Sequence, residues 1–333
     1  MCFHWFKVNF EPTLYTRKIF TMKIGLDIMG GDYAPKAIVL GAIAAHQSLT
    51  PDEQIVLIGD TQQIKPLLLE QGFNPDHFEY HHTEEVIGMG EHATKAILQK
   101  PNSSIAVGFQ LLKAGKIDSF ASAGNSGAML VGAVFSVKPI AGISRPCLCT
   151  IIPKLKGGVG LLLDVGANAD CKPDNLLEFG VLGSLYAEYI MQIENPKVAL
   201  MNIGEEDEKG NMIALASHRL MKEKGVFNFV GNVEGRDLFN DKADVIVCDG
   251  FTGNVMLKLA ESFYVLTIKK GLKDEFFDRF NYENYGGSPV LGVNAPVLIG
   301  HGISSPTAIK NMIFQSRDMI NTGLVSKIQA AFQ

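Results

Sequence analysis

The stretch Lys23-Ile-Gly-Leu-Asp-Ile-Met-Gly-Gly-Asp-Tyr-Ala-Pro35 decides the fold class, because it contains a strand, a tight turn and a helix start in succession. Residues 23–28 form an apolar run of strand length, and residues 29–32 form a Gly-rich turn. Pro35 then stands where a helix begins, since proline is favoured at the first helical position. The stretch therefore predicts a strand followed by a helix that packs against it.

The same strand, turn and helix recur along the chain, a rhythm typical of a sheet that carries helices. Near-continuous apolar strands such as Gly160-Leu-Leu-Leu163 suit a sheet that is covered on both faces. We therefore expect a doubly wound α/β/α sandwich. Further strands are expected at residues 54–58, 78–81, 119–123, 146–152, 159–163, 197–202, 227–230 and 243–248.

Residues 22–333 contain no low-complexity linker and no repeat of fixed period, so we expect a single α/β unit. Residues 1–21 are interpreted as an extension ahead of that unit, with Met22 as an alternative start, because they lack the apolar core and cleavage site of a signal peptide. The polar, Gly-rich residues 281–289 separate a long helical region, about residues 253–285, from the last strands. A closing helix is expected from about Pro306.

The composition excludes several classes of protein. Hydrophobic residues make up 47% of the 333 residues and charged residues 20%, which is incompatible with a disordered chain or a coiled coil. A net charge of −5 without a basic run gives no general attraction for nucleic acid. The 5 scattered cysteines favour a reducing cytoplasm over a disulfide framework or a structural zinc site. No apolar run approaches the roughly 20 residues that span a bilayer.

Turns of one kind follow the apolar strands, and each precedes an expected helix. In an open α/β sheet such turns lie at the carboxyl ends of strands, where a ligand crevice forms, and glycine lets backbone N–H groups approach an anion closely. The expected ligand is a phosphate or a carboxylate, unless Gly, Asn and Asp serve only as helix caps and turn residues. The turns are Met29-Gly-Gly-Asp32, Gly124-Asn-Ser-Gly127, Asp164-Val-Gly-Ala-Asn168, Gly231-Asn-Val-Glu-Gly-Arg-Asp237 and Asp249-Gly-Phe-Thr-Gly-Asn254.

Several catalytic motifs are missing from these turns. No turn contains the P-loop pattern G-x-x-x-x-G-K-[ST], and Gly124-Asn-Ser-Gly127 lacks the spacing of a nucleophile elbow. Gly88-Met-Gly-Glu-His-Ala93 matches the loose dinucleotide pattern, but a charged stretch precedes it in place of an apolar strand. Ser126 is therefore better placed as a helix N-cap and anion ligand than as a nucleophile. The 8 histidines form no recognisable metal-ligand pattern, so we expect no metal.

Four charged or titratable residues stand beside the turns. His301, at the end of the strand that closes with Ile299-Gly300, is the histidine most suited to a functional role, although a structural role in a turn is the alternative. Arg145, Arg236 and Lys258 could each supply fixed positive charge to an anion, or could simply solvate the surface.

The region from Gly253 to Phe280 predicts a long helix that carries both apolar and basic residues. This combination is typical of a helix at a membrane surface or against a partner, whereas an ordinary helix packed on the sheet or in a dimer interface is the alternative. The expected membrane contacts are Phe263, Leu266, Phe276 and Phe277, which accompany Lys269, Lys270 and Lys273.

Taken together and in this order, the blocks of sequence resemble the PlsX-type phosphate acyltransferases, over residues from about 22 to near the C-terminus. The resemblance rests on Asp27-Ile-Met-Gly-Gly-Asp32, Ser122-Ala-Gly-Asn-Ser-Gly-Ala128, Ser144-Arg-Pro146, Leu163-Asp-Val-Gly-Ala-Asn168, Asp170-Cys-Lys-Pro173, Gly231-Asn-Val-Glu-Gly-Arg-Asp237, Asp249-Gly-Phe-Thr-Gly-Asn-Val255, Gly286-Gly-Ser-Pro-Val-Leu-Gly-Val-Asn294 and His301-Gly302.

The resemblance implies a homodimer related in fold to isocitrate and isopropylmalate dehydrogenases and to phosphotransacetylase, without a cofactor. It implies transfer of a fatty acyl group from acyl-acyl carrier protein to inorganic phosphate, which gives acyl phosphate for phospholipid synthesis. It also implies a cytoplasmic protein attached peripherally to the inner face of the membrane, where a membrane glycerol-3-phosphate acyltransferase takes the product.

Such a reaction needs few catalytic groups. Phosphate oxygen attacks the thioester carbonyl, and a thiol with a pKa near 8.5 leaves with little help from a general acid. The protein must hold a dianion and supply donors to the oxyanion. We expect Arg236, Lys258 and His301 to act on the reacting groups. The expected phosphate and substrate ligands are Gly31, Asp32, Asn125, Ser126, Gly127, Asn168, Asn232, Asp249, Asn254 and Asn294.

Two alternatives remain open from the sequence. One is a metal- and NAD-dependent 2-hydroxy acid dehydrogenase of the isopropylmalate type, and the other is a non-catalytic phosphate-binding scaffold at the membrane. A nicotinamide absorbance change would identify the dehydrogenase, and an intact carrier-protein thioester would identify the scaffold.

Overall fold

A computed structural model describes residues 22–333, so the expected N-terminal extension, residues 1–21, lies outside the described residues. The strands form one mixed sheet in the order β3-β2-β1-β4-β11-β10-β5-β6-β9-β7-β8. They are β1 (Met22–Asp27), β2 (Glu53–Gly59), β3 (Glu79–His82), β4 (Ser119–Ser122), β5 (Cys147–Pro153), β6 (Val159–Leu163), β7 (Val198–Met201), β8 (Phe229–Val233), β9 (Val245–Val247), β10 (Gly287–Leu291) and β11 (Val297–Gly300).

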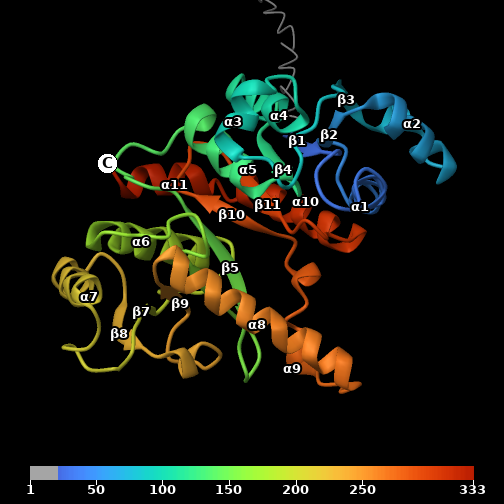
Figure 1. The fold of residues 1–333 in the computed structure, drawn as a ribbon. Coiled ribbons are helices and arrows are strands. Elements are labelled where there is room, and N and C mark those ends of the chain that lie inside the picture. The colour runs from blue at the N-terminus through green and yellow to red at the C-terminus, as the bar shows by residue number, and fades with distance from the viewer. Residues whose placement is uncertain (1–21) are drawn as a thin grey trace, which may run out of the picture.

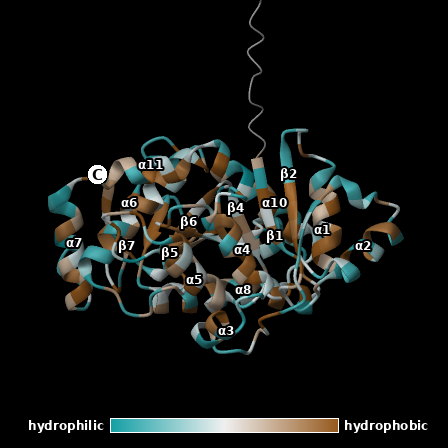
Figure 2. Ribbon diagram, turned by 90° about the horizontal axis from the view of Figure 1, so that it is seen from above, coloured by the Kyte–Doolittle hydropathy of each residue, from teal (hydrophilic) through white to brown (hydrophobic). Residues whose placement is uncertain are grey.

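Helices flank this sheet on both sides (Figures 1 and 2). They are α1 (Lys36–His46), α2 (Thr61–Glu70), α3 (Ala93–Gln99), α4 (Ser104–Lys113), α5 (Ser126–Gly132), α6 (Pro173–Tyr189), α7 (Met212–Lys224), α8 (Gly250–Lys270), α9 (Glu275–Asp278), α10 (Pro306–Asn321) and α11 (Leu324–Ala331). Short 3-10 or π turns lie at Pro75–His77, Ala133–Val137, Gly235–Asp237 and Tyr282–Asn284. The predicted α/β/α sandwich is confirmed.

Successive residues of the inner strands enter separate cores on the two faces of the sheet. In β2, Ile55 and Leu57 pack into one core, whereas Val56 and Ile58 pack into the other. All four side chains are at most 2% exposed, because helices cover both faces. This explains why the strands are almost continuously apolar.

The two halves of the sheet run in opposite directions. Strands β1 to β4 and β11 are parallel to one another, and β6 to β9 are parallel to one another. Between these halves, β10 is antiparallel to both β11 and β5, and β5 is antiparallel to β6. The sequence did not predict this reversal. It means that turns after strands in the two halves do not all lie at one edge.

Three local expectations need correction. The turn that was expected from Gly231 begins later, because Asn232 lies within β8. Asn125, not Ser126, caps α5, since its side-chain oxygen accepts the N–H of Ala128 at 2.9 Å. The long helix expected up to Phe280 is divided, because α8 ends at Gly271, whose φ of +65° is a left-handed helix cap.

Two expectations from the composition concern membrane-spanning helices and disulfides. Among residues 22–333, no helix combines the length and apolar character needed to cross a membrane. The described cysteines Cys147, Cys149, Cys171 and Cys248 are all free and buried, as expected for a chain without a disulfide framework.

Candidate active site

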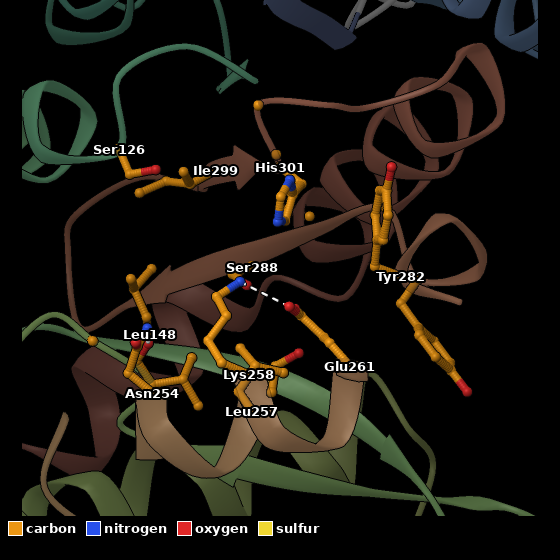
Figure 3. A pocket seen from close by; sticks show the side chains of 18 of the residues that line it. Ser126, Leu148, Asn254, Leu257, Lys258, Glu261, Tyr282, Ser288, Ile299 and His301 are labelled. Carbon is orange, nitrogen blue, oxygen red and sulfur yellow. Dashed lines mark hydrogen bonds and ion pairs between the residues drawn. The ribbon is translucent and has the colours of Figure 1, made fainter. Parts of the chain in front are cut away.

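A cavity of about 570 Å³ lies where the two halves of the sheet meet. Strands β5 and β11 contribute apolar residues to it, β10 contributes Gly287 and Ser288, and the first turn of α5 and the middle of α8 contribute polar residues. Figure 3 shows Ser126 and His301 on one side of the space and Asn254, Lys258 and Glu261 on α8 on the other. Of the turns singled out from the sequence, those after β1, β4, β6 and β9 reach the cavity.

A buried carboxylate organises the wall that follows β1 and β4. Asp27 is fully buried and accepts the N–H of Met29 at 2.9 Å and the hydroxyl of Ser122 at 2.6 Å. Ser122 in turn accepts the N–H of Gly124 at 2.9 Å. Burial raises the pKa of Asp27, whereas these hydrogen bonds act against that rise. Asp27 thus connects the turn after β1 to the turn that starts α5.

Gly31 explains why these turns can pack so tightly. Its φ is +106°, and a Cβ there would lie 3.0 Å from the carbonyl oxygen of Gly302. The N–H of Asp32 donates to the same carbonyl at 2.7 Å. Gly31 therefore supports the wall, while Asp32 itself lines the cavity.

Asn125 and Ser126 have different roles at the start of α5. The amide nitrogen of Asn125 donates to the carbonyl oxygens of Gly88, Met89 and Glu91, at 3.1, 3.1 and 2.9 Å. Asn125 therefore fixes the loop at residues 88–91, and Met89 of that loop lines the cavity. Ser126 and Gly127 line the cavity directly, and their N–H groups belong to a first helical turn, where no intrahelical acceptor exists.

A second buried carboxylate organises the opposite wall. Asp164 accepts the N–H of Leu148 at 3.0 Å, the N–H of Ala167 at 3.1 Å and both the N–H and the amide of Asn168, at 2.6 and 2.9 Å. Burial raises the pKa of Asp164, and these bonds oppose the rise. Because its amide also donates to Pro146, Asn168 belongs to the wall and is not turned towards a ligand.

Helix α8 closes against this wall at Gly253, where a Cβ would overlap the carbonyl oxygen of Asp164. Asp249 caps the helix by accepting the N–H and hydroxyl of Thr252, at 2.8 and 2.9 Å. One turn further, the amide of Asn254 donates to Val165 at 3.1 Å. Asp249 is therefore a helix cap, whereas Asn254 lines the cavity.

Among the described residues that line the cavity, Lys258 is the only lysine or arginine. Its ammonium lies 2.8 Å from the carboxylate of Glu261 on the same face of α8. The side chain of Lys258 is 51% exposed and that of Glu261 is 25% exposed. An ion pair this open is weak, so an incoming anion can compete with Glu261 for the lysine.

His301 is half-buried at the end of β11, and its ring stacks on that of Tyr282, with centroids 5.0 Å apart. Burial lowers the pKa of His301, and the nearby charge of Lys258 lowers it further, whereas Glu261 and Asp32 raise it. This lowered pKa favours the neutral ring at pH 7, and a neutral imidazole can donate one hydrogen bond into the cavity.

The remaining residues predicted from the sequence lie elsewhere. Arg236 is 72% exposed and pairs with Glu234 and Glu205, so the structure does not bring it to the cavity. Asn232 in β8 donates to Glu206. Asn294 donates to Lys138 and Pro139 and accepts from Gln329, so it fastens the segment after α5 to α11. Arg145 donates to the carbonyl of Asp170.

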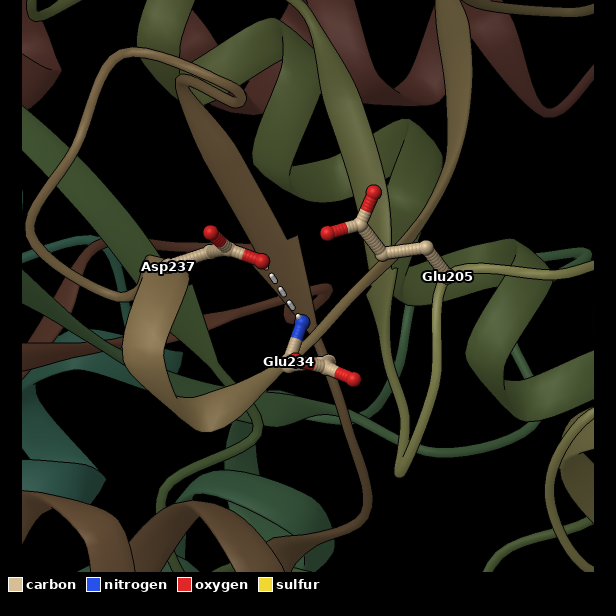
Figure 4. Close-up of side chains that lie close together, drawn as sticks. All are labelled: Glu205, Glu234 and Asp237. Atoms are coloured by element: carbon tan, nitrogen blue, oxygen red, sulfur yellow. Dashed lines mark hydrogen bonds between the residues drawn. The ribbon is translucent and has the colours of Figure 1, made fainter.

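Glu205, Glu234 and Asp237 lie close together beside Arg236 (Figure 4). The ammonium of Lys242 lies 2.6 Å from Glu205 and 2.9 Å from Asp237. These carboxylates are therefore already paired with cations, and we assign no ligand to them.

The aromatic residues expected at a membrane also contact one another. Phe276 and Phe277 are half-buried and pack against Phe239, Phe263 and Phe280, mostly edge-to-face. They are therefore less exposed than their sequence pattern suggested, and their contact with a membrane stays a prediction. The exposed apolar side chains in this region are Val265, Leu266, Ile268 and Leu272.

The sequence reasoning missed Tyr282 and Glu261 as residues of the cavity, along with Thr150 and Ser288. Tyr282 could have been noticed because it stands in the polar stretch at 281–289, and Glu261 because it follows Lys258 by three residues. No local signal marks Thr150, which lies within an ordinary strand.

Solved structures with this architecture define the class of fold. A phosphotransacetylase from Streptococcus pyogenes superposes with a TM-score of 0.67 at 17% identity, over 92% of this chain and 97% of that one. The EutD phosphotransacetylase from Staphylococcus aureus gives 0.61 at 17% identity, over 90% of this chain and 94% of that one. The protein thus has the fold of the phosphotransacetylases.

Sequence comparison identifies the family. Residues 22–327 match the family model described as "Fatty acid synthesis protein". A phosphate acyltransferase of Heliobacterium modesticaldum is 43% identical over 329 residues, 92% of this chain and 97% of that protein. One from Dictyoglomus turgidum is 41% identical over 326 residues, 92% of this chain and 96% of that protein. The chain belongs to this family of phosphate acyltransferases, as its sequence motifs predicted, and it is an acyltransferase.

Proposed function

We propose that the protein transfers a fatty acyl group from the thioester of acyl carrier protein to inorganic phosphate, and so forms acyl phosphate. The observation that carries this proposal is the composition of the cavity. Leu148, Ile152, Leu257 and Ile299 give it an apolar surface, and Ser126 stands at its edge with backbone donors. A substrate with an apolar chain and a reaction partner that is an anion need both kinds of surface.

The charges of the cavity indicate how phosphate would be held. Besides Lys258, the charged lining residues are Asp32 and Glu261, which are both acidic. For phosphate to bind, the ammonium of Lys258 must therefore give up its ion pair with Glu261 and bind a phosphate oxygen instead. The N–H groups of Ser126 and Gly127 supply uncharged donors on the facing wall, which hold an anion without adding repulsion elsewhere.

The reaction follows from this arrangement. A phosphate oxygen attacks the thioester carbonyl carbon, and the C–O bond forms while the carbonyl electrons move to oxygen as an oxyanion. Neutral His301 is placed to donate a hydrogen bond to that oxyanion. The C–S bond then breaks, and the electron pair leaves with the sulfur as the carrier thiolate. No covalent acyl-enzyme is required.

The decisive experiment measures free thiol released from acyl-acyl carrier protein, with and without phosphate. We expect release that depends on phosphate and is equal with and without a chelator. Release without phosphate would contradict the proposed acceptor, and an intact thioester would favour a non-catalytic binder. A parallel assay with nicotinamide, a divalent metal and a 2-hydroxy acid tests the dehydrogenase alternative, for which we expect no absorbance change.

We also propose that the protein is a homodimer that attaches peripherally to the inner face of the membrane, where a glycerol-3-phosphate acyltransferase consumes the acyl phosphate. Exposed apolar residues on α8 and beyond support this proposal, since Leu266, Ile268 and Leu272 accompany Lys269 and Lys270. Figure 1 shows α8 and α9 extending along the outside of the molecule. Apolar insertion and attraction to anionic lipid would add at such a surface.

The membrane contact can be tested by changing exposed apolar residues on α8 and, as a control, exposed apolar residues elsewhere. Leu266→Ser with Ile268→Ser should abolish co-sedimentation with anionic vesicles, while thiol release in solution and the dimer mass stay unchanged. The control Leu98→Ser with Leu69→Ser removes exposed apolar side chains from α3 and α2. If vesicle binding persists in the first variant, this part of α8 is not the contact.

A further inference from the structure

Tyr282 contacts the His301 segment at two points. Its ring stacks on the imidazole, with centroids 5.0 Å apart and planes at 29°. Its hydroxyl donates to the carbonyl oxygen of Ile303 at 2.8 Å. Tyr282 lies in the short turn Tyr282–Asn284, which comes from a different part of the chain than the strand before His301.

The segment that Tyr282 holds is a tight turn. The N–H and the hydroxyl of Ser304 both donate to the carbonyl of His301, at 2.9 and 2.6 Å. Within this turn, the N–H of Ile303 points at Nδ1 of His301 from 3.4 Å. Tyr282 therefore holds Ile303 by its carbonyl oxygen, while the N–H of the same residue faces the imidazole.

This arrangement determines which nitrogen of His301 carries the proton. A backbone N–H can only donate, so Nδ1 must be the acceptor, and the proton of the neutral ring then lies on Nε2. The charged groups that face the ring are Lys258 and Glu261 from α8 and Asp32 from the turn after β1. None of these three belongs to the turn itself, so the turn adds one further contact, the Ile303 N–H, which favours a proton on Nε2.

We propose that Tyr282 is a positioning residue, which holds the turn at Ile303 so that His301 presents an Nε2–H donor to the cavity. The proposal deepens the proposed phosphate acyltransferase function and rests on it for its catalytic meaning. The tautomer of His301 and the stacking of Tyr282 on its ring do not depend on which reaction takes place in the cavity.

The test uses the full chain with ¹⁵N-labelled histidine and follows the ring nitrogens by NMR across pH 5–8. His301→Gln identifies the signal of His301. In the wild type we expect an acceptor-type Nδ1 and a protonated Nε2. Tyr282→Phe removes the bond to Ile303 and should mix the two tautomers, whereas Tyr282→Leu also uncovers the ring and should move the pKa of His301 upwards.

Activity provides the second readout. In both variants we expect kcat to fall about three- to tenfold, the effect of one lost hydrogen bond of ordinary strength, with KM for phosphate unchanged. In Tyr282→Leu the acidic limb of the kcat profile should move to higher pH together with the titration of His301. The matched control is Tyr80→Phe, which removes the same kind of bond, from a tyrosine hydroxyl to the carbonyl of Pro75 at 2.7 Å.

The outcomes separate the two proposals. If the His301 signals of both Tyr282 variants match those of Tyr80→Phe, the positioning role is refuted. If the wild type releases no thiol but its His301 signals respond to Tyr282→Phe as expected, the proposed reaction fails and the positioning role stands.

Discussion

Lys258→Ala and Arg236→Ala form a pair of substitutions with opposite expected results. Both side chains are positively charged and both were expected from the sequence to act on phosphate. Lys258 lines the cavity, whereas Arg236 lies on the surface beside Glu234 and Glu205. We expect a large loss of activity for Lys258→Ala and a change of less than about twofold for Arg236→Ala, as for most exposed surface residues.

The magnitude for Lys258 follows from its two partners. Losing one charged donor to a transition state costs about 3–4 kcal/mol. The wild-type lysine must first leave Glu261, and an exposed pair of that kind contributes about 0–1 kcal/mol. The difference, about 2–4 kcal/mol, corresponds to a loss of about 30- to 900-fold in kcat/KM.

The assay is thiol release from acyl-acyl carrier protein with phosphate below its KM, on purified variants whose thermal unfolding matches that of the wild type. Lys258→Arg keeps the charge and should recover part of the loss. Activity of Lys258→Ala within threefold of the wild type would refute the role of this lysine. An equal loss in Arg236→Ala would show that the phosphate site extends beyond the cavity described above.

Two further predictions concern stability. Gly253→Ala should lower the free energy of unfolding by about 1–3 kcal/mol, because the added methyl group overlaps the carbonyl of Asp164. The control is Gly90→Ala, where a Cβ meets open space, and equal urea midpoints for the two variants would contradict the predicted overlap at Gly253. Asp244→Asn should cost about 3–5 kcal/mol, because it leaves the ammonium of Lys154, 2.6 Å away and similarly buried, without its partner. Burial raises the pKa of Asp244, but the hydrogen bonds from Lys154 and the N–H of Lys197 bring the pKa below 3.8 overall. The stability from this pair is therefore present above about pH 4 and lost as the pH falls through the lowered pKa. The urea midpoints at pH 7 and pH 3 should differ less in Asp244→Asn than in the wild type. An equal difference in both proteins would contradict this pH dependence.

The strands could be predicted from the sequence because burial on both faces leaves a signal in each of them. Residues 159–163 are an apolar run whose successive members, Leu161 and Leu162, enter different cores. The reversal at β5 and β10 leaves no such signal, since an antiparallel strand in the middle of a covered sheet is as apolar as a parallel one.

The site could be predicted only in part. Turn composition led to Ser126, Asn254 and Lys258, and the structure brings all three to the cavity. It could not distinguish them from Asn168 or Asp249, because an amide or carboxylate that caps a turn has the same local sequence as one that faces a ligand. That distinction depends on acceptors that lie far away in the chain.

The membrane residues show a related limit. Phe276 and Phe277 follow a basic helix and are strongly apolar, so the sequence pattern favoured exposure. Their actual environment depends on Phe239, which comes from another segment and packs at 6.0 Å against Phe276. Periodicity on one helix cannot reveal such a partner.

The order of the strands also has a consequence for how the protein is made. β4 and β5 follow each other in sequence, but β11 and β10 lie between them in the sheet. On a ribosome that adds about 5–20 residues per second, roughly ten to thirty seconds separate the synthesis of β4 from that of the hairpin at residues 287–300. During that interval both strands are open edges, which are prone to pair with other chains. The nascent protein therefore needs protection at its centre, and its cavity is complete only after the hairpin at residues 287–300 and His301 have been made.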